Sequence, residues 1–145
     1  MNKTIYHLSH IDLDGYSCQL VMAQTKHTMI SYNANYGAEV MDRLEEIIER
    51  IKKNKQEATI LISDLNLYPE EAKWLNNEVN RLNDSGWNIT ITLLDHHGSG
   101  KDTAAQYPWY TLDTERCATK IVYDYACDHY GLFKGGWLEA FVSVV

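Results

Sequence analysis

Acidic residues and histidines gather in three short stretches of this chain. They are SHIDLDG at residues 9–15, ISDL at residues 62–65 and LLDHH at residues 93–97. Carboxylate oxygens and imidazole nitrogens bind catalytic metal ions and serve as acids and bases in hydrolytic enzymes. The residue types therefore indicate metal-assisted hydrolysis, provided that the fold brings the three stretches together. Together they offer four carboxylates and three imidazoles: His10, Asp12, Asp14, Asp64, Asp95, His96 and His97.

Four carboxylates in one crevice repel one another unless a cation lies between them. Two divalent ions about 3.5–4 Å apart would remove that repulsion, with one carboxylate bridging both. Ligand sets that mix His and Asp suit manganese, iron, cobalt or zinc better than calcium. Such ions lower the pKa of a water molecule until it can attack phosphorus near neutral pH. We expect two divalent cofactor ions, Mn²⁺ first, with Co²⁺, Fe²⁺, Zn²⁺ and Mg²⁺ as alternatives.

The stretch GSGK, which directly follows His97, is not a phosphate-binding P-loop. The P-loop pattern needs a glycine five positions before its Gly-Lys pair and a Ser or Thr after the lysine. Here those positions hold Asp95 and Asp102. We therefore expect a flexible loop with a solvated Lys101.

Strand-like and helix-like patterns alternate along the chain. Apolar or β-branched runs predict strands at residues 4–9, 27–33, 58–65, 87–95 and 109–112. Apolar residues at helical spacing predict helices at 39–51, from Pro69 to about residue 82, at 117–130 and from 136 onward. The alternation predicts a single α/β domain with a doubly wound, mostly parallel five-stranded sheet and helices on both faces.

Open parallel sheets bind ligands outside the carboxyl ends of their strands, and all three stretches follow a predicted strand. In an extended segment, His10, Asp12 and Asp14 would point the same way, and Gly15 would let the chain turn into a helix. Simpler interpretations exist for each stretch alone. Asp12 and Asp14 could form a turn and a helix cap, Asp64 could be a turn residue, and the histidine pair could be structural.

Charge and cysteine content limit the partners. The 145 residues carry a net charge of −7, which argues against a large basic nucleic-acid surface but not against a phosphate ester held by metal ions. Three scattered cysteines suit a reducing cytoplasm, and no apolar run has the length of a membrane span. A homodimer stays an open alternative.

A second anion site is predicted where the helix at residues 117–130 begins. Its free N–H groups, with Arg116, Thr119 and Lys120, could receive a substrate phosphate. Ordinary capping and a solvated lysine explain the same residues equally well.

The three stretches resemble the motifs of the DHH phosphoesterase family, which is named for the triplet at Asp95. SHIDLDG is similar to the first motif, the Asp64 of ISDL to the second and DHH to the third, in matching order over nearly the whole chain. Members of the family include single-strand exonucleases, oligoribonucleases, cyclic-dinucleotide phosphodiesterases and pyrophosphatases. The form HIDLDG is closer to the nucleic-acid and oligonucleotide members.

The resemblance implies a role for each residue. His10 and Asp12 would bind one metal ion and Asp14 and His96 the other, with Asp64 bridging both. His97 would contact the scissile phosphate or assist the leaving group. Asp95 would orient the imidazoles or approach a metal ion.

The resemblance also implies an extent and a function. The family's fourth motif, an Asp after a later helix, and its C-terminal substrate-binding domain have no counterpart in residues 1–145, so we expect the N-terminal catalytic domain, weak or inactive by itself. The expected substrate is a short oligonucleotide or a cyclic or linear dinucleotide. The alternatives are a pyrophosphatase-like hydrolase and a non-catalytic metal-binding or receiver-type domain.

Overall fold

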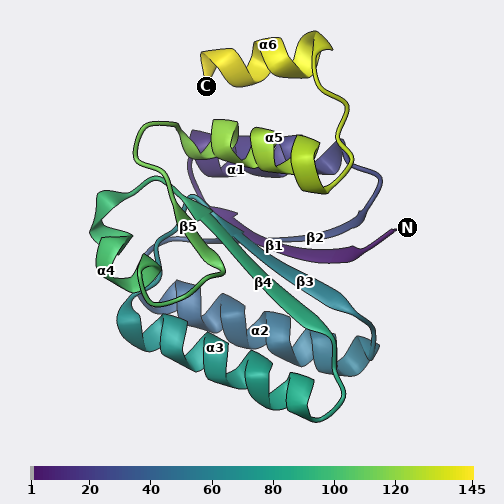
Figure 1. The fold of residues 1–145 in the computed structure, drawn as a ribbon, viewed down its shortest axis with the longest axis vertical. Helices are drawn as coiled ribbons and strands as arrows, with labels where there is room; N and C mark the ends of the chain where they lie inside the picture. The colour runs from purple at the N-terminus through teal and green to yellow at the C-terminus, as the bar shows by residue number, and fades with distance from the viewer. Residues whose placement is uncertain (1) are drawn as a thin grey trace.

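The computed structural model describes residues 2–145 and contains one five-stranded sheet (Figure 1). All neighbouring strands are parallel, in the order β2-β1-β3-β4-β5. The strands are β1 Thr4–His10, β2 Thr28–Ala34, β3 Ala58–Ser63, β4 Ile89–Asp95 and β5 Tyr110–Leu112. The carboxyl ends of β1, β3 and β4 therefore lie side by side at the centre of one edge.

Helices cover both faces of the sheet (Figure 1). They are α1 Leu13–Ala23, α2 Ala38–Asn54, α3 Pro69–Asp84, α4 Lys101–Ala104, α5 Ala118–His129 and α6 Gly136–Val144. Helices α2 and α3 lie on one face, α1 and α5 lie on the other, and α6 lies outside α5 (Figure 1). The predicted doubly wound α/β fold is confirmed. No helix within residues 2–145 is long and apolar enough to cross a membrane.

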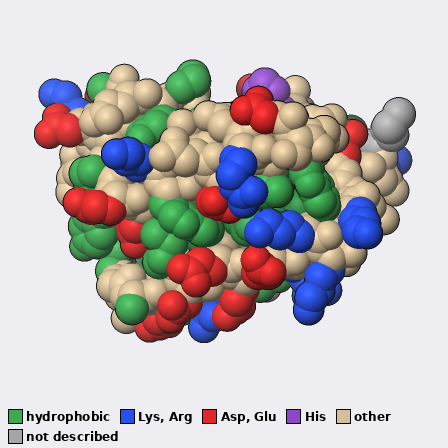
Figure 2. All heavy atoms as spheres, turned by 90° about the horizontal axis from the view of Figure 1, so that it is seen from below, with side chains coloured by type: hydrophobic (Ala, Val, Ile, Leu, Met, Phe, Trp, Pro, Cys, Tyr) green, Lys and Arg blue, Asp and Glu red, His purple; other side chains and the backbone are tan. Residues whose placement is uncertain are grey.

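Two apolar layers result from the alternation of side chains along the strands. In β1, Tyr6 and Leu8 pack with α2 and α3, whereas Ile5 packs with α1 and α5. The layer under α2 is built from the helical face predicted from its sequence, whose buried residues are Val40, Leu44, Ile47, Ile48 and Ile51. On the outside of α2 and α3, acidic and basic side chains are interspersed (Figure 2).

The GSGK stretch is not the loop that we expected. Residues Gly98–Gly100 form a 3-10 turn, and Lys101 opens the short helix α4. Gly100 is buried against Tyr110, and only glycine fits there, because a β-carbon would lie 2.2 Å from the Tyr110 hydroxyl oxygen. The lysine itself is exposed, as predicted.

Candidate metal centre

Asp64 lies at the centre of the polar cluster at the carboxyl edge. The predicted strand to residue 65 ends earlier, at Ser63, because Asp64 takes a left-handed conformation with φ 58°. A left-handed backbone is uncommon for residues other than Gly, although Asp tolerates it. The turn places the Asp64 side chain at the ends of β1 and β4, where it is 1% exposed.

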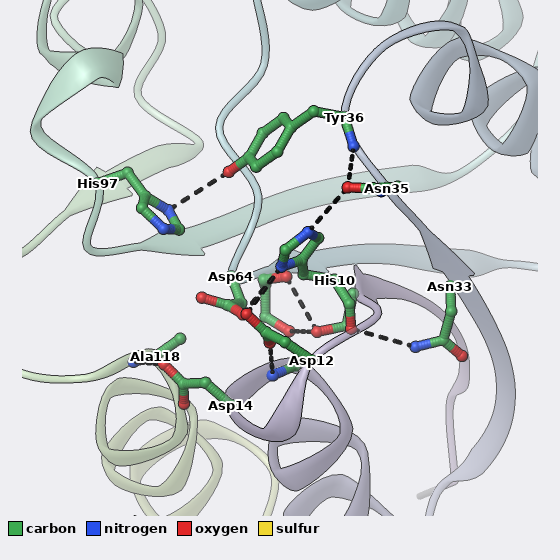
Figure 3. Close-up of polar contacts among 12 residues, drawn as sticks. His10, Asp12, Asp14, Asn33, Asn35, Tyr36, Asp64, His97 and Ala118 are labelled. Carbon is green, nitrogen blue, oxygen red and sulfur yellow. Dashed lines mark hydrogen bonds and ion pairs between the residues drawn. The ribbon is translucent and has the colours of Figure 1, made fainter.

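His10, Asp12 and Asp64 form the first group of metal-ligand type (Figure 3). His10 Nδ1 lies 2.9 Å from Asp12 Oδ2 and 3.9 Å from Asp64 Oδ2. The other ring nitrogen, Nε2, lies 3.3 Å from the side-chain oxygen of Asn35. Such a contact fixes the ring of a metal-binding histidine and leaves the opposite nitrogen for the ion.

The segment after His10 is extended only as far as Asp12, because α1 begins at Leu13 and places Asp14 in its first turn. Asp12 is the N-cap of α1 and accepts a hydrogen bond from the Gly15 N–H at 2.8 Å. The cap interpretation is therefore correct, and the Asp12 Oδ2 oxygen still faces His10. Gly15 is needed for close approach rather than for a turn, because a β-carbon would lie 2.0 Å from the His10 carbonyl oxygen.

Asp64, Asp95, His96 and His97 form the second group. His96 Nε2 lies 3.0 Å from Asp64 Oδ1, and His97 Nδ1 lies 2.8 Å from Asp95 Oδ1. The His96 and His97 rings lie beside each other just after β4, with centroids 4.3 Å apart, and His96 also approaches Asp14 of α1. Asp64 belongs to both groups, which is the property of a bridging ligand.

Asp14 lies beside the second group but is also held by α5. The Ala118 and Thr119 N–H groups donate to its two oxygens at 3.1 Å and 2.9 Å, and the Thr119 hydroxyl donates to the same carboxylate. Asp14 Oδ2 is still 3.5 Å from His96 Nε2. The N-terminus of α5 thus fixes Asp14 next to a predicted metal ligand (Figure 3).

The predicted phosphate site at this helix is occupied by groups of the chain itself. Asp14 receives the free N–H groups and the Thr119 hydroxyl. Arg116 pairs with Asp113 and Asp124, and the Lys120 ammonium lies 3.1 Å from Asp124. These contacts match the capping interpretation, and we do not propose substrate binding at this helix.

The donor set suits divalent transition ions. One buried oxygen of Asp64 and one of Asp95 have no hydrogen-bond partner within the described residues. Burial, together with Asp12, Asp14 and Asp95, raises the pKa of Asp64 to about 9. Neighbouring carboxylates repel one another when both are ionised, and a cation between them removes this repulsion. The imidazole ligands favour a transition-metal ion over magnesium or calcium.

Two residues near the cluster escaped the sequence analysis. Asn35 and Tyr36 follow β2 at the same edge, and Tyr36 lies between His10 and His97 (Figure 3). The Tyr36 hydroxyl is 3.4 Å from His97 Nδ1, and the ring centroids of Tyr36 and His10 are 5.2 Å apart. The sequence signal that could have identified Asn35 and Tyr36 is their position directly after a predicted strand.

Two curated proteins are similar to this chain over nearly its whole length. No family model matches. The chain is 49% identical over 145 residues to a 3′,5′-cyclic-nucleotide phosphodiesterase of Helicobacter pylori, covering 97% of this chain and 42% of that protein. It is 27% identical over 150 residues to oligoribonuclease NrnB of Bacillus subtilis, covering 35% of that protein.

A solved structure shows the same fold. The crystal structure of an uncharacterized protein from Helicobacter pylori G27 matches with a TM-score of 0.93 and 48% identity. The match covers 97% of this chain and 42% of that one. The chain thus spans less than half the length of each relative, while each match covers 97% of this chain.

Proposed function

We propose that this chain is the metal-binding part of a DHH-type phosphoesterase that hydrolyses phosphodiester bonds of nucleotides. The observation that carries the proposal is the convergence of six carboxylate and imidazole side chains from the ends of three strands around a seventh, the buried Asp64. Single caps or structural histidines do not explain why the three stretches meet at one point.

Two divalent ions, for which Mn²⁺ is the first candidate, would both bind Asp64. His10 and Asp12 would complete the first metal site. His96, together with Asp14 or Asp95, would complete the second metal site. When bound, the ions neutralise the carboxylates and supply Lewis acidity for hydrolysis. Asn35 and Thr119 would hold His10 and Asp14 in place for this purpose.

We assign His97 the role of general acid for the leaving oxygen. Its Nδ1 is paired with the fully buried Asp95, while the His97 side chain is 36% exposed. The carboxylate fixes the ring through Nδ1 and leaves Nε2 as the nitrogen that can donate a proton to an ester oxygen. A pair of a buried Asp and a half-exposed His suits proton transfer at the rim of the crevice.

The substrate class comes from the relatives. One is named as a phosphodiesterase of 3′,5′-cyclic nucleotides and the other as an oligoribonuclease. Both names describe cleavage of a phosphate ester that joins nucleoside groups. We therefore infer that cyclic nucleotides and short oligonucleotides are the substrates to examine first.

A substrate panel tests the proposal. The protein is incubated with Mn²⁺ or with EDTA and given a dinucleotide, 3′,5′-cyclic AMP or inorganic pyrophosphate. We expect Mn²⁺-dependent release of mononucleotide from at least one diester and loss of that activity in Asp64→Asn. Hydrolysis of pyrophosphate alone would favour a pyrophosphatase. Because residues 1–145 are expected to be weak or inactive by themselves, a chain as long as the relatives is assayed in parallel, and no hydrolysis of any of the three by either chain would contradict an enzymatic role.

A further inference from the structure

A surface hollow of about 400 Å³ opens beside His97, outside the carboxylate cluster. Tyr36 and His97 line it on the side of the cluster, and Tyr68 and Pro69 line it where α3 begins. Its volume is within the range of pockets that bind small organic ligands, about 300–1,000 Å³. An ester whose phosphate lies at the cluster would therefore extend one substituent toward this hollow.

Asn66 is the unexplained polar group of the hollow. The residue is only 7% exposed, and its backbone N–H donates to the Tyr36 hydroxyl at 3.4 Å. Its side-chain amide makes no hydrogen bond to any residue in the described part of the chain. The amide atoms are not among the fully enclosed unpaired polar atoms of the described residues, so a group in the hollow can reach them. Because Asn66 lines the hollow, a ligand there is the partner within its reach.

The other lining residues indicate a neutral, planar ligand. Among the described residues, no Lys or Arg lines the hollow, whereas the acidic Asp102 does. A second phosphate would therefore be repelled rather than bound. Tyr68 is 49% exposed at the rim and offers a ring face for stacking. A side-chain amide and an exposed aromatic ring are the groups that bind nucleobases, by pairing with the base edge and by stacking.

We propose that this hollow receives one nucleobase of the substrate while the phosphate lies at the carboxylate–imidazole cluster. The Asn66 amide, with its donor and acceptor, pairs with the edge of the base, and Tyr68 stacks on its face. These two residues thereby set the preference for nucleotide esters over other phosphate esters. The inference rests on the proposed function, because the cluster must anchor the phosphate.

Calorimetry with Mn²⁺-loaded protein tests the subsite without requiring turnover. The probes are the four nucleoside 5′-monophosphates and ribose 5-phosphate, which carries the same sugar and phosphate but no base. We expect at least one nucleotide to bind about 10-fold tighter than ribose 5-phosphate, because stacking of the base on an aromatic ring adds affinity that the sugar and phosphate lack. Asn66→Leu and Tyr68→Ala should each reduce this difference and leave the affinity for ribose 5-phosphate unchanged.

A matched control is Phe133→Ala, which removes an exposed aromatic ring between α5 and α6, on the other face of the sheet. The control should bind every probe as the unmodified protein does. Equal affinity for nucleotides and ribose 5-phosphate would overturn the subsite, even if the metal-dependent hydrolysis is found. Tyr68 is exposed, so its variant keeps the test decisive if Asn66→Leu does not fold. Unchanged base preference in Tyr68→Ala together with absent base density in a nucleotide-soaked crystal would also overturn it.

Discussion

A single aspartate connects the two halves of the centre. Asp64 lies within reach of His10 on one side and His96 on the other, and it is the most buried carboxylate of the first group. Its raised pKa of about 9 results from burial first and from the neighbouring aspartates second. Without a metal ion, the ionised form of Asp64 is therefore unfavourable. Metal ions on both sides would stabilise that form.

His97 provides a prediction about the leaving group. In His97→Ala, we expect kcat on a dinucleotide to fall about 100-fold, because general acid catalysis typically contributes 10²–10⁴-fold. Turnover of bis(p-nitrophenyl) phosphate should fall far less, since the phenolate leaves without needing a proton. Steady-state kinetics on both substrates measure the difference.

The control for this variant is His129→Ala, which removes an exposed histidine at the end of α5. It should change neither substrate's turnover. A parallel loss on both substrates in His97→Ala would show that His97 acts through the metal ions or the fold instead of by protonating the leaving oxygen.

His7 provides a prediction about acid stability. It is fully buried, and its Nε2 lies 2.7 Å from the Ser63 hydroxyl oxygen. Burial lowers the pKa of His7 from 6.5 to about 3. The unfolded chain therefore binds a proton between pH 6.5 and 3 that the folded chain does not, so this residue makes stability fall as pH falls below 6.5.

The expected slope from His7 is up to about 1.4 kcal/mol per pH unit in that window. Urea unfolding of the protein and of His7→Gln at pH 7, 6 and 5 isolates this contribution from the carboxylates. The free energy of unfolding should fall more steeply for the unmodified protein. Identical pH slopes would mean that His7 is not held neutral by burial.

At the scale of elements, the N-terminus of α5 holds a carboxylate of the candidate site in place. Its first N–H groups and the Thr119 hydroxyl bind Asp14, so a helix terminus that could have received substrate serves to orient a carboxylate. Such partners of ligand residues typically change metal affinity 10–100-fold when they are removed.

Thr119→Val tests this support, because valine keeps the shape of the buried threonine and removes its hydroxyl. We expect Mn²⁺ affinity to fall about 10-fold in Thr119→Val and to stay within about 2-fold in Thr119→Ser. Calorimetric titration with Mn²⁺ measures both. An equal loss of Mn²⁺ affinity in both variants would show that the packing of Thr119, and not its hydroxyl group, affects metal binding.

The sequence predicted which segments form strands and helices better than it predicted where each of them ends. Apolar runs and helical spacing located the five strands and the helices at 39–51, 69–82, 117–130 and 136 onward, since burial on a parallel sheet leaves a strong pattern. The apolar run over residues 58–65 did not show that the strand ends before Asp64, which takes a left-handed backbone. The cap at Asp12 was among the interpretations that the sequence allowed, because its partner Gly15 is only three residues away.

The site was predicted in its main part, because parallel strands deliver their following residues to one edge. Seven acidic and histidine side chains meet there as expected. The capture of Asp14 by Thr119 could not be predicted, since 105 positions separate the two residues. Asn35 and Tyr36 were missed because neither residue type is distinctive at a strand end.

At the scale of the molecule, one sheet edge combines the cluster with the hollow beside His97. The outer face of α2 and α3 carries mixed charges and gives no basic track for a long nucleic acid (Figure 2). With a net charge of −7, the protein attracts a phosphate ester only where cations neutralise the cluster. Under the proposed function, this charge distribution favours small nucleotide esters over long polymers as substrates.

The central claim is that Asp64 is the shared ligand of a divalent metal centre. Calorimetric titration of Mn²⁺ into the protein and into Asp64→Asn tests it most directly. Asparagine tolerates the left-handed backbone of position 64, and circular dichroism confirms that the variant is folded. We expect saturable binding of Mn²⁺ to the unmodified protein and loss of that binding in Asp64→Asn. No binding to the unmodified protein, or equal binding to both, would contradict the claim.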